Sequence, residues 1–112
     1  MALTSMNISR DRHGNTYPLP VAPGYVNYRV FAAATAETPA VPTGAQFVVV
    51  IPTVDSYVNL STTAAVPAAD VTDGTGSVLV PAGFPRMFCL GSLTSFSVIA
   101  SAAGVVALEF YS

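Results

Sequence analysis

Short runs of β-branched and aromatic residues, separated by turn residues, recur along the chain from Tyr28 to its end. These runs occupy residues 28–35, 46–51, 56–60, 77–81, 86–90, 95–100 and 105–111. Helix signals are nearly absent, and short strands at fairly regular spacing are typical of sandwiches and barrels. Parallel β/α units would need helices that this sequence does not contain. The pattern predicts an all-β fold, an antiparallel β-sandwich or a jelly-roll-like barrel of six to eight short strands.

Three segments of this pattern differ in their expected burial. Residues 46–51 are largely β-branched and precede Pro52, which suits a central strand buried on both faces. Residues 56–60 alternate polar and apolar side chains, so we expect a half-exposed strand with Tyr57 paired to a neighbouring strand. Residues 64–76 hold too many turn residues for a strand and too few periodic apolar groups for a helix. We predict a long surface loop there.

The end of the chain predicts a β-hairpin. Residues 95–100 and 105–111 both resemble strands, and the short connector 101–104 ends in glycine. Alternate residues of a strand share one face, so one set in the last run should point into the core. That inward set is expected to be Val106, Leu108 and Phe110.

The first 27 residues differ in composition from the rest of the chain. Pro18, Pro20 and Pro23 each remove a backbone donor, so this part can form neither a central strand nor a long helix. We therefore divide the chain into an extended N-terminal arm, residues 1–27, and a β-sandwich domain, residues 28–112. Apolar side chains in the arm favour a docked segment, and the alternative is a loose terminus of the kind that many domains carry.

The chain is poor in charge. Charged residues make up 9% of it and hydrophobic residues 52%, with four arginines and no lysine, whereas soluble domains are about 25% charged. A monomer usually covers its surface with mixed charges, so we expect much of this surface to be covered by protein. No apolar run approaches the roughly 20 residues of a spanning helix, and no signal peptide is visible. With a net charge of −2 and no basic run, we expect neither a membrane nor a nucleic-acid partner.

Few residues offer chemistry. His13 is the only histidine and lies in the arm, where a surface position is favoured over a general base. Cys89 is the only cysteine, and its apolar neighbours predict a buried structural thiol. One histidine and one cysteine are too few for a zinc site. We predict no catalytic residue, cofactor or metal, and keep an enzyme built on Cys89 or His13 as a third hypothesis, which predicts rapid reaction of the native protein with a thiol reagent.

Two further features each allow two interpretations. The loop around Asp70, Asp73 and Gly74 weakly resembles a calcium loop, but it lacks a closing glutamate, so a tight turn is favoured. The five tyrosines could form a sugar-binding platform, although tyrosines on strands also serve protein interfaces. These are Tyr17, Tyr25, Tyr28, Tyr57 and Tyr111.

Several segments, taken in order, carry a resemblance to a known class of protein. They are residues 17–20, 48–52, 55–58, 66–77, 80–86 and 105–111, and together they span most of residues 17–111. In the style and order of these segments the chain resembles small β-sandwich virion proteins of tailed bacteriophages, the capsid decoration, cement or stabilisation proteins. The resemblance implies a protein made in the host cytoplasm and located on the capsid surface. Its partner would be the major capsid protein or another virion protein.

Low charge and this resemblance lead to one functional prediction. We expect a structural protein that bridges and stabilises neighbouring coat subunits by packing, without catalysis. We also expect symmetric self-association, with a homotrimer as one candidate state. The arm would reach an adjacent subunit, and its predicted contacts are Arg10, Arg12, Tyr17, Leu19 and Tyr25. The alternative is a tail- or fibre-associated module that binds a receptor or a glycan, which predicts an exposed aromatic cluster.

Overall fold

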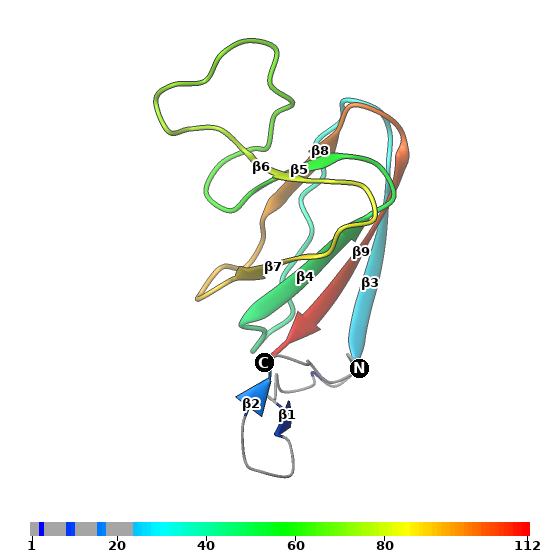
Figure 1. The fold of residues 1–112 in the computed structure, drawn as a ribbon, viewed down its shortest axis with the longest axis vertical. Helices are drawn as coiled ribbons and strands as arrows, with labels where there is room; N and C mark the ends of the chain where they lie inside the picture. Colours follow the sequence, from blue (N-terminus) through cyan, green and yellow to red (C-terminus); the bar gives the residue numbers. More distant parts are fainter. Residues whose placement is uncertain (1–2, 4–8, 11–15, 18–23) are drawn as a thin grey trace.

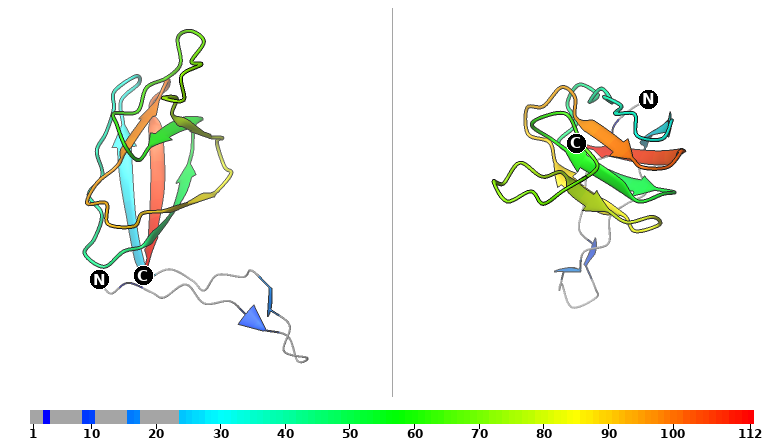
Figure 2. Two further views of the ribbon diagram at one scale, coloured as in Figure 1. Left: turned by 90° about the vertical axis from the view of Figure 1, so that its left-hand side faces the viewer. Right: turned by 90° about the horizontal axis from the view of Figure 1, so that it is seen from above.

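The computed structural model describes residue 3, residues 9–10 and 16–17, and residues 24–112. Within these residues it contains strands and no helix, and seven of the strands form two antiparallel sheets. The two sheets face one another across a common core (Figures 1 and 2). The fold is therefore an all-β sandwich, which confirms the predicted fold class.

Strand pairing defines the two sheets. The larger sheet has the order β3-β9-β4-β7, and the smaller sheet has the order β6-β5-β8. The larger sheet consists of β3 (Tyr25–Phe31), β4 (Phe47–Pro52), β7 (Arg86–Cys89) and β9 (Gly104–Tyr111). The smaller sheet consists of β5 (Ser56–Asn59), β6 (Val78–Val80) and β8 (Ser97–Ala100).

The core is formed by alternate residues of facing strands. On β9 the predicted inward set of Val106, Leu108 and Phe110 is at most 1% exposed, which confirms the expectation. Val48 and Val50 of β4 are fully buried beside it in the same sheet. The smaller sheet supplies Val58, Val80, Val98 and Ala100. Removal of such side chains from water is the main stabilising term of this fold.

The predicted C-terminal hairpin is wrong. β8 and β9 follow one another in the chain but lie in different sheets, because β8 pairs with β5 whereas β9 pairs with β3 and β4. Residues 101–103 carry the chain from one sheet to the other. The inward residues of both strands therefore face each other across the core. A hairpin within one sheet and a connection between two sheets need the same alternation of side chains. The local sequence therefore could not distinguish these two arrangements.

β4 is an interior strand, as predicted, but it is not buried on both faces. Val48, Val50 and Pro52 are buried, while the alternate residues Phe47, Val49 and Ile51 are half-buried on the side away from the core. The apolar residues of this strand therefore lie in two environments: one alternating set is in the core, and the other is on the partly exposed side of the sheet.

β5 is more buried than its alternation predicted. Ser56 and Asn59 are 0% and 8% exposed, because their polar groups are satisfied within the protein. The Ser56 hydroxyl donates to the Val54 carbonyl at 2.9 Å. Tyr57 is paired across two neighbours, Leu79 of β6 and Ile99 of β8, and this pairing confirms the expectation for Tyr57.

The described parts of the N-terminal segment include two short strands. β1 (Ser9–Arg10) pairs with β2 (Thr16–Tyr17), and among the described strands neither joins the larger sheets. In both figures β1 and β2 lie beyond the end of the sandwich. Leu3 packs against the core. β3 begins at Tyr25, three residues before the expected start of the strand region at Tyr28.

Residues 34–41 close one side of the sandwich. They run along the outer edge of β8, where Glu37 and Val98 exchange two backbone hydrogen bonds of 2.8 and 2.9 Å. A further bond joins the Val41 N–H to the Thr94 carbonyl at 2.8 Å. This segment satisfies the backbone groups of β8 that its partner β5 does not reach.

The connection between β5 and β6 forms the predicted surface loop, which projects from the sandwich in Figure 1. Serine side chains fasten its base: Ser97 Oγ accepts from the Ala64 N–H at 2.9 Å, and Ser77 Oγ accepts from the Ala65 N–H at 3.2 Å. Near its tip, Asp73 Oδ1 accepts from the Thr75 hydroxyl at 2.6 Å and from the Thr75 N–H at 3.2 Å. Gly74 has a φ of +85°, so the favoured tight turn is what forms.

Candidate protein interface

The side of the larger sheet that faces away from the core is the principal candidate site. Residues directly opposite one another in antiparallel strands point to the same side, so the register assigns its members. We call this set the outer face: Val26, Tyr28, Val30, Phe47, Val49, Ile51, Met87, Cys89, Val105, Ala107, Glu109 and Tyr111. Glu109 is its only charged member. The remaining residues are aliphatic, aromatic, methionine or cysteine.

The edges of the outer face are open to solvent. On β3, Tyr28 and Val30 are 70% and 75% exposed, and on β7 Met87 is 49% exposed. Between them Val49 and Ile51 are half-buried, since neighbouring side chains on the sheet shield one another. A continuous apolar surface of this kind is uncommon on a soluble monomer and typically marks a contact with another macromolecule.

Glu109 lies inside the outer face, directly opposite Val26 of β3 and Val49 of β4. Its side chain is half-buried. A carboxylate that loses more of its water on docking must gain a cation or hydrogen-bond donors in return. The outer face therefore favours a partner surface that is apolar around one arginine or lysine.

Tyr111 is the buried member of the outer face, at 2% exposed. Burial, and then the negative charge of Glu109, raise the pKa of the Tyr111 phenol above its ordinary value. The phenol therefore stays neutral to higher pH in the folded protein than in the unfolded chain.

The five contact residues predicted in the arm are placed unequally. Arg12 and Leu19 lie outside the described residues. Arg10 and Tyr17 are described only as members of the β1–β2 ladder, with Arg10 opposite Thr16 and Tyr17 opposite Ser9. Tyr25 is fully described and belongs to the sandwich: its ring meets the Phe110 ring edge to face, with centroids 6.0 Å apart. The contacts of the other four side chains with Tyr25 are not tested, because those side chains lie outside the described part of the chain.

The prediction of a buried thiol is wrong, because Cys89 is exposed. It lies on the outer face at the end of β7, opposite Phe47. The apolar run that suggested burial belongs to an edge strand, whose neighbours cover it on one side only. His13 lies outside the described residues, so its surface position stays a prediction.

Four of the five tyrosines, Tyr25, Tyr28, Tyr57 and Tyr111, do not gather into a platform. Tyr28 is exposed on the outer face, Tyr25 points to the core side of the same sheet, and Tyr57 lies on the opposite sheet. Tyr111 is buried. A sugar-binding surface needs flat aromatic faces that are close together and open. The exposed aromatic cluster expected of a glycan-binding module is therefore not formed by these four residues.

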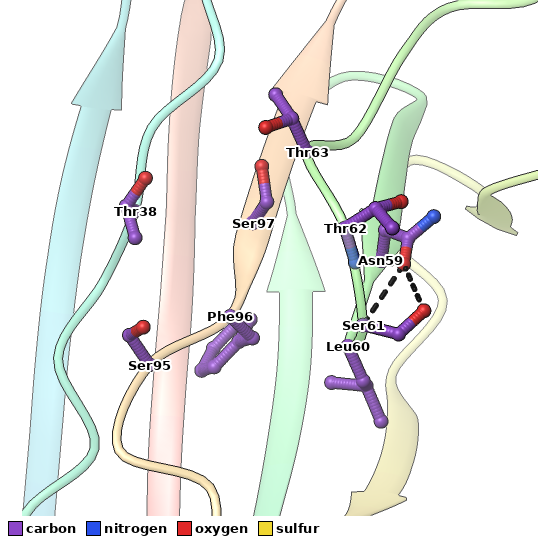
Figure 3. A pocket seen from close by; sticks show the side chains of 9 residues that line it. All are labelled: Thr38, Asn59, Leu60, Ser61, Thr62, Thr63, Ser95, Phe96 and Ser97. Carbon is purple, nitrogen blue, oxygen red and sulfur yellow. Dashed lines mark hydrogen bonds between the residues drawn. The ribbon is translucent and has the colours of Figure 1, made fainter.

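A polar depression of about 260 Å³ lies between the turn after β5 and the start of β8 (Figure 3). Its polar groups hold the local backbone: Asn59 Oδ1 accepts from the N–H groups of Ser61 and Thr62 at 3.0 and 2.9 Å. Ser97 at its wall fastens the loop described above. Phe96 is the one aromatic residue among its described lining, and it is buried. The polar groups of this depression therefore serve to hold the loop backbone in place.

Sequence reasoning missed the outer face, although a signal was present. The run 46–51 is apolar at both alternating positions, and we interpreted this as burial on both sides within the chain. The same pattern fits a strand with one side in the core and the other side exposed as an apolar surface that can contact another protein. The 9% charge content pointed the same way.

Within the described part of the chain, no three His, Cys, Asp or Glu side chains are grouped so that they could hold a metal ion. None of the described residues forms a helix long and apolar enough to cross a membrane. Comparisons of this chain with protein-family models, with curated proteins and with solved structures found no match.

Proposed function

We propose that this chain is a structural protein of a tailed-bacteriophage virion, a capsid decoration or cement protein that bridges and stabilises neighbouring coat subunits. The observation that carries the proposal is the outer face, an apolar sheet surface that is open to solvent at its edges and carries a single charge. The resemblance of the sequence segments suggests a tailed-bacteriophage virion as the particle. The outer face suggests how the protein attaches to it, through an apolar contact. The protein acts by packing and is not an enzyme.

The chemistry of the outer face describes the coat surface that it fits. Apolar side chains of the coat protein would cover Val49, Ile51 and Met87, and one arginine or lysine would meet Glu109. Permanent interfaces of this kind are more apolar than ordinary protein surface, and a desolvated ion pair fixes their register. The low charge of the chain fits this role, because a surface that coat subunits cover does not need charged side chains. The protein would be made in the host cytoplasm and would function on the capsid surface.

Two matched variants test the attachment. Met87 on the outer face and Leu79 on the opposite sheet are 49% and 45% exposed, so a glutamate should be tolerated about equally at each position. Each protein is mixed with capsids of the encoding phage that were assembled without it, and bound protein is measured after sedimentation. We expect Met87→Glu to weaken binding about tenfold or more, because it would bury a carboxylate among the apolar groups of the contact. Leu79→Glu should bind as the unchanged protein does.

The other outcomes are equally informative. If Met87→Glu binds as well as Leu79→Glu, the outer face is not the contact. If the unchanged protein does not sediment with capsids, the virion proposal is wrong. Saturable binding to oligosaccharides in the absence of capsid binding would favour the receptor- or glycan-binding alternative.

A further inference from the structure

The sheet edges of this protein are protected unequally. β8 is covered by residues 34–41, through the paired bonds between Glu37 and Val98. β6 has three residues, and the Arg86 guanidinium donates to its Leu79 carbonyl at 3.2 Å. β7 has four residues and follows directly on Pro85. Short strands, prolines and charged side chains are the usual protection of an edge.

β3 is the exception. It has seven residues, Tyr25–Phe31, it contains neither lysine nor proline, and among the described strands it pairs only with β9. Its one charged side chain, Arg29, is bound to Glu37 at 2.8 Å. Tyr28 and Val30 leave the surface beside this edge open. A long, unprotected edge with apolar neighbours is a template for another strand.

The sequence of β3 is complementary to itself in one antiparallel register. If Tyr28 lies opposite Tyr28 of a second copy, all seven residues pair, with Val26 opposite Val30 on the outer face. On the inner side Asn27 lies opposite Arg29, whose guanidinium keeps further donors for the amide oxygen. Centring the pairing on Arg29 would place two guanidinium groups opposite each other, which is unfavourable.

We infer that two copies of this chain associate through their β3 strands about a twofold axis at Tyr28, joining their larger sheets into one sheet of eight strands. Such a contact is closed, because each copy uses its β3 edge once. The two outer faces then lie on the same side of the joined sheet and form one apolar surface. This differs from the homotrimer considered from the sequence. The inference does not rest on the proposed function, because the pairing involves this chain alone.

Cysteine crosslinking reads the register directly. In a Cys89→Ser background, Y28C places two thiols opposite each other, where paired Cα atoms lie about 4.5–5.5 Å apart, within the range of a disulfide. The control is V30C, on the same face and with similar exposure. Its two copies lie four residues out of register, about 13 Å apart. Mild oxidation should convert Y28C into a crosslinked dimer and leave V30C monomeric under denaturing electrophoresis.

Two charge variants test the same register without oxidation. V26K/V30K places lysines opposite lysines across the twofold axis, whereas V26K/V30E places lysine opposite glutamate. Lysine is used at position 26 because Glu109 faces it within the same chain. Light scattering should give twice the chain mass for the unchanged protein and for V26K/V30E, and a monomer for V26K/V30K. Circular dichroism verifies that both variants are folded.

A monomer at all concentrations for the unchanged protein, a stable trimer, or crosslinking of V30C as fast as Y28C would each overturn this inference. Capsid binding is read separately, by sedimentation of Met87→Glu and Leu79→Glu. A failure of β3 pairing therefore cannot be confused with a failure of the virion proposal.

Discussion

Arg29 on β3 and Glu37 beyond the end of that strand are joined across the side of the sandwich, with Nη2 of Arg29 2.8 Å from Oε2 of Glu37. The backbone of Glu37 is bonded at the same time to Val98 of the smaller sheet. One residue thus ties both sheets together.

We expect the ion pair of Arg29 and Glu37 to make a small but measurable contribution to the free energy of unfolding. The two side chains are 41% and 28% exposed, so solvent screens their attraction. A double-mutant cycle of Arg29→Met and Glu37→Gln should give a coupling free energy of about 0.2–1 kcal/mol that declines with added salt. The measurement is urea unfolding in the V26K/V30K background, so that self-association does not contribute. A coupling that is unchanged in high salt would contradict an electrostatic origin.

Gly104, the first residue of β9, should not tolerate a side chain. A Cβ there would lie 2.7 Å from Val54 Cγ2 and 3.1 Å from Thr53 Oγ1, and valine has little rotamer freedom with which to move away. We expect Gly104→Ala to lower the free energy of unfolding by about 1–3 kcal/mol. Adding Val54→Ala should restore part of that loss. If the double variant loses the sum of the two single losses, the clash is not the cause.

The stability of the fold should fall in alkali through Tyr111. Its pKa is raised in the folded state by burial and by Glu109. A raised folded-state pKa gives a stabilisation that is complete below the unfolded pKa, about 10 for tyrosine, and is lost as pH rises through the folded value. The free energy of unfolding should therefore decline above about pH 10. The decline should be shallower in Tyr111→Phe and in Glu109→Gln, measured by urea unfolding at each pH.

Cys89 should report on contacts of the outer face. Because it is exposed, a thiol reagent should modify the native protein quickly. Rapid modification therefore no longer singles out the enzyme hypothesis, since exposure alone explains it. In protein bound to capsids the reaction should slow strongly, and release from the capsid should restore it. Equal rates in the free and bound forms would place the contact elsewhere.

The sequence predicted the strands well and their pairing poorly. Alternation in residues 105–111 identified the inward set of β9, because burial on one side leaves a local pattern of period two. The pairing of β8 and β9 could not be read this way, since a hairpin and a crossing between sheets have the same local pattern. The buried Asn59 and Ser97 were missed for a related reason: their hydrogen bonds go to the loop backbone, and the sequence does not reveal those partners.

The sequence predicted that the candidate site is a protein interface, but it did not predict which residues form that interface. Low charge predicted a covered surface, whereas the arm residues were chosen on apolar content and resemblance. Locating the outer face required the register, because only the pairing of Val49 with Glu109 and Met87 shows that these residues share one side. Cys89 illustrates the same limit: an apolar run does not distinguish the core from an uncovered sheet face.

The position of β9 governs when this protein can fold. Tyr25 opens the larger sheet, but its partner is Phe110, and β4 also depends on β9 for one of its two neighbours. During synthesis, β3 must therefore remain without its partner strand, and β4 with β7 as its only neighbour, until residues 104–111 have emerged. Contacts so distant in sequence form slowly, and the waiting strands can aggregate. We therefore expect the larger sheet to stay incomplete in the nascent chain until residues 104–111 have left the ribosome.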